Sequence, residues 1–498
     1  MKKYVFFRVL RSIISVFLVT TLTFIIIYSL VPRRDVFKGD PMSQKLASTP
    51  DALLNYEYNG YEKMNYIDFK NTKDLVTAVE KKYPKSGVTT AHTAANKAIL
   101  DKWAKANNFN IRRYKISKDF YAVRELPLWE RLGRFYGKMI QIDHPWRIHD
   151  KNNPNLPRYE KIQHDPTVGW ALVGSGTKYR YQIYFNGSFP YIHQNIIKFN
   201  LGTSYPTYAG NPVSEVIGGR QGEQKTQQIT TKNGKKYNTA DDVYLRAYQP
   251  RGKQDSMEKE IYGDDYVNVT PELQDPSMLG TSFRAGIAAL IIAYGLSIPM
   301  AIYMARRKGK LFDKIGTGFV TVMTAVPTLA IIYVFRYLFA AAFKWPDSFP
   351  TLGAQAFSSW ISPAVILGIM NVTGLIIWFR RYIIDQQSAD YIKFAKAKGL
   401  NESEIYTKHI FKNASIPIVN GIPGSIIFTL GGATMTEEIF AMPGMGKMLP
   451  DAIIAHNNTV VIGLVFIFTV IAVLSVLLGD LLMAIVDPRI KLSASGDD

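Results

Sequence analysis

Few residues of this chain combine the types and spacings that catalysis or metal binding requires. The chain has no cysteine, so it offers no thiolate nucleophile, disulfide or thiolate metal site. Its seven histidines form no HExxH pair and no other ligand spacing. The phosphate-binding pattern GxxxxGK followed by Ser or Thr is absent, since its nearest approach, residues 444–448, has Met after GK and lacks the first glycine. The sequence predicts no catalytic residue and no metal site, and any process driven by ATP would need separate ATPase chains.

Ionisable residues inside apolar segments are the next candidates, because a charge in hydrocarbon is costly and usually functional. They are Arg336, Glu437, Glu438 and Asp480. A proton or cation relay would need carboxylates near the middle of several helices. Arg336 instead lies toward a helix end, and both glutamates lie where their segment ends. The sequence therefore predicts that Arg336, Glu437 and Glu438 are not proton carriers.

Two uncharged polar residues, Asn371 and Thr373, lie in the apolar segment 360–379. They could line a polar pathway across a membrane. Hydrogen bonding between helices explains them equally well. The sequence leaves both interpretations open.

The stretch 390–413 has the pattern of two short helices separated by a sharp stop. Residues 390–398 favour a helix, and Gly399 suits the left-handed position that ends one. Asn401 with Glu404 has the spacing of a capping box, so a second helix should begin at once and run toward Asn413. On this pattern alone, the stretch could be a plain polar connector between two membrane helices.

Six apolar segments are long enough to cross a bilayer. They cover residues 13–31, 283–304, 315–343, 360–379, 414–440 and 460–486. A secretory signal is the rival interpretation of the first segment. No small-residue cleavage site follows it, which favours a retained helix with a cytoplasmic N-terminus. Six crossings then place the C-terminus in the cytoplasm as well.

The distribution of basic residues supports this orientation. The pieces expected in the cytoplasm hold 18 Lys and Arg, whereas the two short outer loops hold one each, Lys344 and Lys447. Such an excess on the cytoplasmic side is the positive-inside pattern. The formal net charge of +19 therefore needs no nucleic-acid partner.

Residues 33–281 lack a spanning segment and are numerous enough to form a domain. Helical spacing over 89–106 and 126–139, and alternation over 179–185, predict a mixed α/β domain. With 37 Lys and Arg against 27 Asp and Glu, we expect a solvated basic surface. Its place between the first two apolar segments puts this domain outside the cell.

The stretch 390–419 resembles the cytoplasmic coupling loop of ABC importer permeases, in the form carried by the peptide permease branch. The generic importer loop begins with a glutamate that is missing here. The matching residues are Asp390, Tyr391, Ala395, Lys396, Ala397, Lys398, Gly399 and Leu400.

Three further segments carry the same resemblance. Residues 431–449 are similar to a second signature of the family, placed by analogy near an outer gate, with Met442 where tryptophan is common. Asp480 with residues 487–490 is similar to the end of the sixth helix in the family. Residues 199–217 are similar to the segment that precedes the second helix. In this chain an insertion over residues 218–281 separates that segment from the helix. The residues that match the second signature are Glu438, Phe440, Pro443, Gly444 and Gly446.

The resemblance implies a membrane subunit of an oligopeptide importer of the Ami/Opp type of Gram-positive bacteria, with six helices and a large extracellular domain between helices 1 and 2. Implied partners are a second similar permease, two cytoplasmic ATPases that bind ATP and magnesium, an extracellular peptide-binding lipoprotein and membrane lipid. The expected parts are residues 1–32, 33–281, 282–488 with the coupling loop 380–413, and the tail 489–498.

Two other classes stay open from the sequence. An ion-coupled secondary transporter would need carboxylates at the middle of the membrane and internal repeats, and neither is visible. A membrane-anchored sensor or adhesin would not need six helices.

Overall fold

The structure is a computed structural model, and it describes residues 2–84, 86–89, 94–147, 150, 152–187, 191–250, 256–267 and 270–486. The chain divides into two compact units. Unit 1 comprises Met1–Pro41, Tyr205–Tyr208 and Ser277–Asp498, and unit 2 comprises Met42–Ser204 and Ala209–Pro276. Each unit is described by itself.

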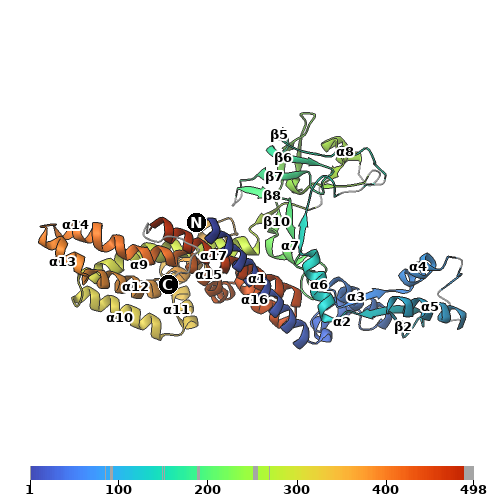
Figure 1. The fold of residues 1–498 in the computed structure, drawn as a ribbon, viewed down its shortest axis with the longest axis horizontal. Helices are drawn as coiled ribbons and strands as arrows, with labels where there is room; N and C mark the ends of the chain where they lie inside the picture. The colour runs from blue at the N-terminus through green and yellow to red at the C-terminus, as the bar shows by residue number, and fades with distance from the viewer. Residues whose placement is uncertain are drawn as a thin grey trace. The chain divides into compact units, whose positions relative to one another are not determined.

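Unit 1 is helical (Figure 1). Four of its helices contain a described stretch long and apolar enough to cross a membrane: Phe6–Leu30, Met278–Arg306, Phe357–Gln387 and Asn458–Met483. These match four of the six expected segments. Its elements are α1 (Lys2–Leu30), η1 (Arg33–Phe37), α9 (Met278–Arg306), α10 (Leu311–Ala325), α11 (Thr328–Phe343), α12 (Phe357–Gln387), α13 (Asp390–Ala397), α14 (Glu402–Glu404), η3 (Ile405–Phe411), α15 (Lys412–Phe440), α16 (Met445–Ile454) and α17 (Asn458–Val486).

The segment expected as one helix over 315–343 differs from that expectation. It forms two helices, α10 and α11, and the chain bends by 113° between them. Pro327 lies between them, where it lacks the N–H that a continuous helix needs and disfavours helical geometry at Val326. One crossing here would be a bent pair of helices.

The segment expected over 414–440 corresponds to α15, a helix of 29 residues. The side chains of residues 428–432 inside it lie outside the description. The helix that begins after Asn401 was expected to end near Asn413. Instead, α14, the π-helix η3 and α15 follow one another without an intervening loop, so the coupling stretch continues directly into a long helix.

Close packing of α9 against α12 forms the centre of unit 1. Ala289 and Ala293 on α9 are fully buried. A Cβ on Gly368 of α12 would lie 2.8 Å from the Ile292 side chain of α9, so only glycine fits there. Small residues thus let the two helices approach, as is usual in bilayers.

Unit 2 contains both helices and antiparallel sheets, as the sequence predicted for this part of the chain. In a three-stranded sheet, β3 (Phe120–Glu125) pairs with both β1 (Ile67–Lys70) and β2 (Asn110–Arg113). Its core includes Leu75, Leu100 and Trp103 from α4 (Thr72–Lys82) and α5 (Ala94–Asn107).

A second, four-stranded sheet runs in the order β5–β6–β7–β8. Its strands are β5 (Tyr159–Asp165), β6 (Gly169–Ser175), β7 (Tyr181–Phe185) and β8 (Ile192–Gln194). The remaining elements of unit 2 are α2 (Pro41–Lys45), α3 (Pro50–Lys63), α6 (Leu128–Met139), β4 (Ile140–Ile142), β9 (Ile197–Phe199), α7 (Val213–Gly218), β10 (Gln221–Gln224), β11 (Gln227–Thr230), β12 (Lys236–Thr239), η2 (Val243–Leu245), β13 (Ala247–Tyr248), α8 (Ser256–Tyr262), β14 (Tyr266–Val267) and β15 (Leu273–Asp275).

Candidate functional site

The predicted helix stop at Gly399 and the predicted capping box after it are confirmed. Helix α13 ends at Ala397, and Gly399 follows with φ +77°, a left-handed conformation that costs other residues free energy. The capping box is complete, because the Glu404 N–H donates to Asn401 Oδ1 at 2.8 Å and the Asn401 N–H donates to Glu404 Oε2 at 3.3 Å. The stop and restart of the helix are therefore fixed by the chain itself.

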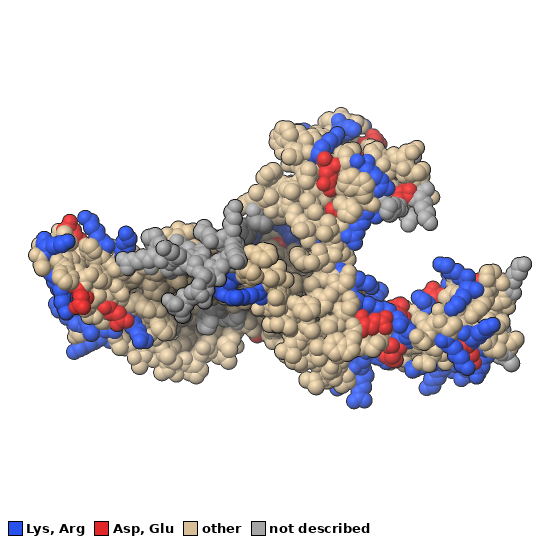
Figure 2. Space-filling view, in the orientation of Figure 1, with Lys and Arg blue, Asp and Glu red and all other residues tan. Residues whose placement is uncertain are grey.

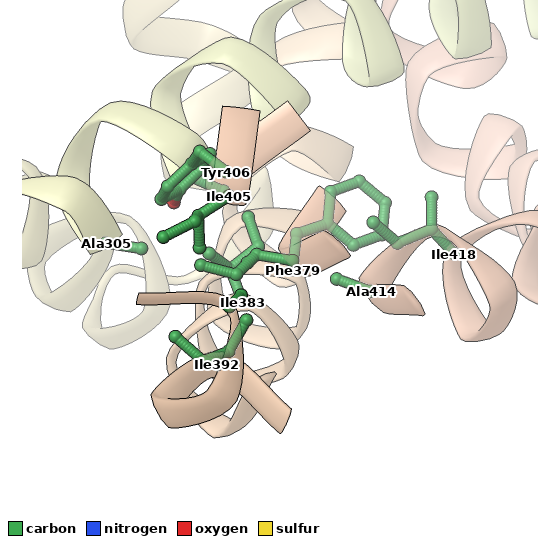
Figure 3. Packing of buried hydrophobic residues seen from close by; sticks show 11 residues of the cluster. Ala305, Phe379, Ile383, Ile392, Ile405, Tyr406, Ala414 and Ile418 are labelled. Atoms are coloured by element: carbon green, nitrogen blue, oxygen red, sulfur yellow. The ribbon is translucent and has the colours of Figure 1, made fainter. Parts of the chain in front are cut away.

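One face of α13 packs on the rest of unit 1. Ile392 and Ala395 are 4% and 6% exposed and belong to an apolar cluster with residues of α9, α12, η3 and α15. Figure 3 shows the side chain of Ile392 close to that of Ile383 of α12. Tyr391 and Leu400 are half-buried against the same cluster. Ala395 is thus buried against its own chain and does not face a partner.

The opposite face of α13 is exposed. Of its residues, Asp390 and Ala397 were singled out from the sequence, whereas Lys393 and Phe394 were not. Phe394 is 70% exposed, and Asp390, Lys393 and Ala397 are exposed on the same helical face. Lys396, Lys398 and Gly399 are exposed as well. We call Asp390, Lys393, Phe394 and Ala397 the α13 surface. Its signal in the sequence is the helical spacing of Phe394 from Asp390 and Ala397.

The helix ends around α13 are joined by polar contacts. Tyr406 of η3 donates its hydroxyl to the Ile302 carbonyl of α9 at 3.4 Å, and Arg306 lies 4.9 Å above its ring. Asp313 at the start of α10 accepts two hydrogen bonds of 2.8 Å from Arg380 of α12. Together with the apolar cluster, these contacts join η3 to α9 and α10 to α12 around α13. Figure 2 shows Lys and Arg gathered at the end of unit 1 that carries α13 and α14.

The second site lies at the other end of α15, about 43 Å along a helix of this length. Glu437 is 1% exposed. Its carboxylate accepts hydrogen bonds from Ser282 Oγ of α9 at 2.6 Å and from the Lys447 N–H at the start of α16 at 2.8 Å. The N-terminus of α16 also attracts the negative charge. Glu437 thereby joins three helices, and sequence reasoning did not assign it this role.

The glycines of the second signature make room for this carboxylate. A Cβ on Gly444 would overlap the Glu437 carboxylate, and one on Gly446 would lie 3.0 Å from Glu437 Oε2. A pair of glycines after a proline, a few residues beyond a glutamate, is the signal that could have revealed the arrangement. We call Glu437, Ser282, Gly444 and Gly446 the Glu437 turn.

The other residues expected here lie around the same turn. Glu438 is exposed and pairs with Lys447 at 3.1 Å. Phe440 is buried, and its carbonyl accepts a hydrogen bond from Phe349 at 2.8 Å. Arg336 donates to the Ile439 carbonyl at 2.9 Å and so lies at the C-terminal end of α15. Pro443 lines a pocket beside the turn.

The structure does not bring Asn371 and Thr373 to either site. Asn371 donates to the Leu367 carbonyl of its own helix at 2.8 Å. Thr373 is buried, and its hydroxyl has no hydrogen-bond partner among the described residues. Asp480 pairs with Arg8 of α1 at 2.7 Å. Within the described ranges, no group of three or more His, Cys, Asp or Glu residues could hold a metal ion.

Comparisons with known proteins give consistent results. Residues 297–492 match the family model described as a binding-protein-dependent transport system inner membrane component. The oligopeptide transport system permease protein AmiC of Streptococcus pneumoniae is 48% identical over 100% of both chains. The dipeptide transport system permease protein DppB of Lactococcus lactis is 35% identical over 43% of this chain and 70% of its own. A chain of the MetNI methionine ABC transporter matches with a TM-score of 0.35 and 13% identity, over 42% of this chain and 93% of that chain.

Proposed function

The chain belongs to the family of binding-protein-dependent transport system inner membrane components, and on this premise we propose that it is the permease subunit of an ATP-driven oligopeptide importer. The observation that carries the proposal is the 48% identity to AmiC over the full length of both chains. The protein forms half of the path through the membrane. It is a transport subunit rather than an enzyme, and ATP is hydrolysed in partner chains.

The partners follow from the same premise. A permease of this family works with a partner permease, ATPases and a substrate-binding protein. The specific assembly that we propose contains one second, similar permease, two cytoplasmic ATPases that bind ATP and magnesium, and an extracellular peptide-binding lipoprotein. The subunit resides in the cell membrane.

We further propose six crossings, with the bent pair α10–α11 as the third, both termini in the cytoplasm and unit 2 outside the cell. The Arg8–Asp480 ion pair supports part of this topology, because it places the start of α1 and the end of α17 at the same end of unit 1. The Lys and Arg gathered around α13 support a cytoplasmic position for that end. Protease added to protoplasts should then cut within unit 2, and complete protection would overturn the topology.

The coupling element in this proposal is residues 390–400. The α13 surface contacts an ATPase, helped by Lys396 and Lys398, while Tyr391, Ala395 and Leu400 fix the helix to the bundle and Gly399 sets its end. The polar contacts of Asp313, Arg380 and Tyr406 transmit ATPase motion to the other helices. The Glu437 turn, with Glu438, Phe440 and Pro443, forms part of the outer gate, and Asn371 and Thr373 lie along the pathway.

The test is uptake of a labelled oligopeptide by cells that lack other peptide importers and express this chain with its partners. Uptake should stop when ATP is depleted and continue when a protonophore collapses the proton gradient. A nucleotide-binding chain should copurify with the permease. Uptake that follows the proton gradient would favour an ion-coupled secondary transporter, and absence of any peptide uptake would overturn the proposal.

A further inference from the structure

A pocket of about 680 Å³ lies beside the Glu437 turn, and all of its walls belong to unit 1. Its volume falls in the range of small-ligand sites, about 300–1,000 Å³. The walls come from the segment after α1, from Pro206, Thr207 and Tyr208, from the start of α9, and from the turn 441–444, α16 and the start of α17. In the proposed topology each of these segments lies at the extracellular end of the bundle.

The walls of the pocket are fixed by contacts within unit 1. Asn457 donates to the hydroxyl of Thr207 at 2.7 Å and to its carbonyl at 3.3 Å. The ring of Tyr205 lies 5.5 Å from that of Phe37. Glu437 holds the first turn of α16 on the opposite side. The pocket is therefore present before any ligand arrives, which lowers the entropic cost of binding.

The lining combines an apolar wall with three polar groups besides Thr207, whose hydroxyl accepts a hydrogen bond from Asn457. Met278, Met442, Met448, Ala452, Ala455 and Val460 supply the apolar wall. Methionine adapts to side chains of different shape, so such a wall suits variable ligands. The polar groups are Tyr208, Lys447 and Asp451.

The charges of these groups favour a cationic ligand. Lys447 is already neutralised by Glu438 at 3.1 Å. Asp451 lies one helical turn further along α16 and forms no ion pair with any residue in the described part of the chain. Tyr208 is half-exposed, and its hydroxyl can donate a hydrogen bond into the pocket. Partial burial and the nearby Asp451 carboxylate raise the pKa of this phenol above its ordinary value.

We propose that this pocket binds the amino-terminal end of the transported peptide directly on the permease. The α-ammonium group pairs with Asp451, the Tyr208 hydroxyl donates to the first carbonyl, and the first side chain lies against the methionine wall. A lipid fits less well, since its acyl chain would meet an unpaired carboxylate and its phosphate would find Lys447 already paired. The inference rests on the proposed function, because it assumes that peptide reaches the extracellular end of unit 1.

The test uses the whole assembly of both permeases and the ATPases, purified without the binding lipoprotein. Binding of a fluorescent hexapeptide with a free amino terminus is compared with binding of its N-acetylated form. The free form should bind at least tenfold more tightly. Asp451→Asn should remove this difference, while Asp347→Asn, an acidic residue of an outer loop outside the pocket, should preserve it.

A second pair of variants tests the volume of the pocket without changing its charge. Ala455→Phe places a ring in the pocket and should weaken peptide binding at least tenfold. Ile454→Phe is the matched control, because Ile454 is exposed on the same helix and does not line the pocket. Equal binding by all variants, or equal binding of free and acetylated peptide, would overturn the inference. So would a phospholipid that copurifies with the wild-type assembly and is lost in Ala455→Phe.

Failure of this inference can be told from failure of the proposed function. If Asp451→Asn and Ala455→Phe cells import peptide like the wild type, the subsite is wrong and the importer stands. If wild-type cells import no peptide, the proposed function itself is wrong.

Discussion

Small residues pack against buried groups beside both ends of α15, but the buried groups differ. We call these regions the α13 end and the α16 end, after the helix that lies beside each. At the α13 end, Ala395 fits an apolar cluster made by four other helices. At the α16 end, Gly444 and Gly446 fit a buried carboxylate. In both places the small residues of a family signature serve packing within the chain. The groups that we propose for contact with a partner or ligand lie nearby: Phe394 follows Asp390 by one turn on α13, and Asp451 lies further along α16.

The difference between the ends lies in what stabilises them. Apolar contacts and a few polar ties hold the α13 end, and one face of the helix remains free for another protein. Hydrogen bonds to Glu437 hold the α16 end, where this one carboxylate accepts from both Ser282 and the Lys447 N–H. We therefore expect the α16 end to respond to substitution mainly in stability and the α13 end mainly in association.

The largest loss of stability should come from Glu437→Ala. Removal of the carboxylate leaves the Lys447 N–H and the Ser282 hydroxyl without their acceptor, and each unpaired buried group costs about 1–3 kcal/mol. Thermal unfolding of the purified assembly should shift to clearly lower temperature. Glu437→Gln keeps an acceptor oxygen and should lose much less. An unchanged melting temperature for Glu437→Ala would show that the hydrogen bonds of Glu437 do not stabilise the α16 end.

The next largest effect should be a difference between glutamate substitutions on the two faces of α13. Ala395→Glu would bury a carboxylate among apolar side chains without a partner, so the variant should reach the membrane at reduced abundance. Ala397→Glu adds the same charge on the exposed face, so abundance should stay normal while ATPase copurification falls. Immunoblots of membranes and of purified assemblies measure both. Equal behaviour of the two variants would show that the faces are assigned wrongly.

Features of these sites that depend on residues close in sequence could be predicted, whereas features that depend on residues far apart in sequence could not. The helix stop at Gly399 and the Asn401–Glu404 capping box depend on neighbours in sequence, and both were predicted correctly. The inward face of α13 depends on α9, α12 and α15, so the alanines alone could not show which of them is buried. The Glu437–Ser282 contact joins residues 155 positions apart, and no local pattern encodes it.

The fold shows the same limit. Long apolar segments predicted α1, α9, α12 and α17, because length and composition suffice for a spanning helix. The bend between α10 and α11 was missed although Pro327 lies at it, since many membrane helices tolerate proline. The assignment of Tyr205–Tyr208 to unit 1, between two parts of unit 2, depends on distant contacts. Its signal in the sequence was the resemblance of residues 199–217 to the segment before the second helix.

A smaller effect, confined to association, is expected for Phe394→Ala. Its ring makes most of its surface available to solvent, so removing it should leave the melting temperature of the isolated permease unchanged. If the ring is a central contact with an ATPase, its loss should cost about 2 kcal/mol, or roughly a thirtyfold weaker association. Phe312→Ala is a control, because that exposed aromatic lies on α10 outside the α13 surface. Titration of the ATPase onto permease in nanodiscs measures both variants, and equal affinity would remove Phe394 from the coupling element.

The smallest effect should come from Glu438→Gln, the neighbour of the most sensitive residue. Glu438 is exposed and its ion pair with Lys447 is at the surface, so its loss should cost no more than about 1 kcal/mol. Peptide uptake should remain dependent on ATP and insensitive to a protonophore, because a proton carrier has no role in the proposed importer. Adjacent glutamates would then differ from each other by several-fold in their effect on stability, for the single reason that one accepts buried hydrogen bonds and the other faces water. If Glu438→Gln instead destabilised the assembly as much as Glu437→Ala, the Glu437 turn would not be the element that holds this end of the bundle. If it made uptake follow the proton gradient, the proposed ATP-driven import would be wrong.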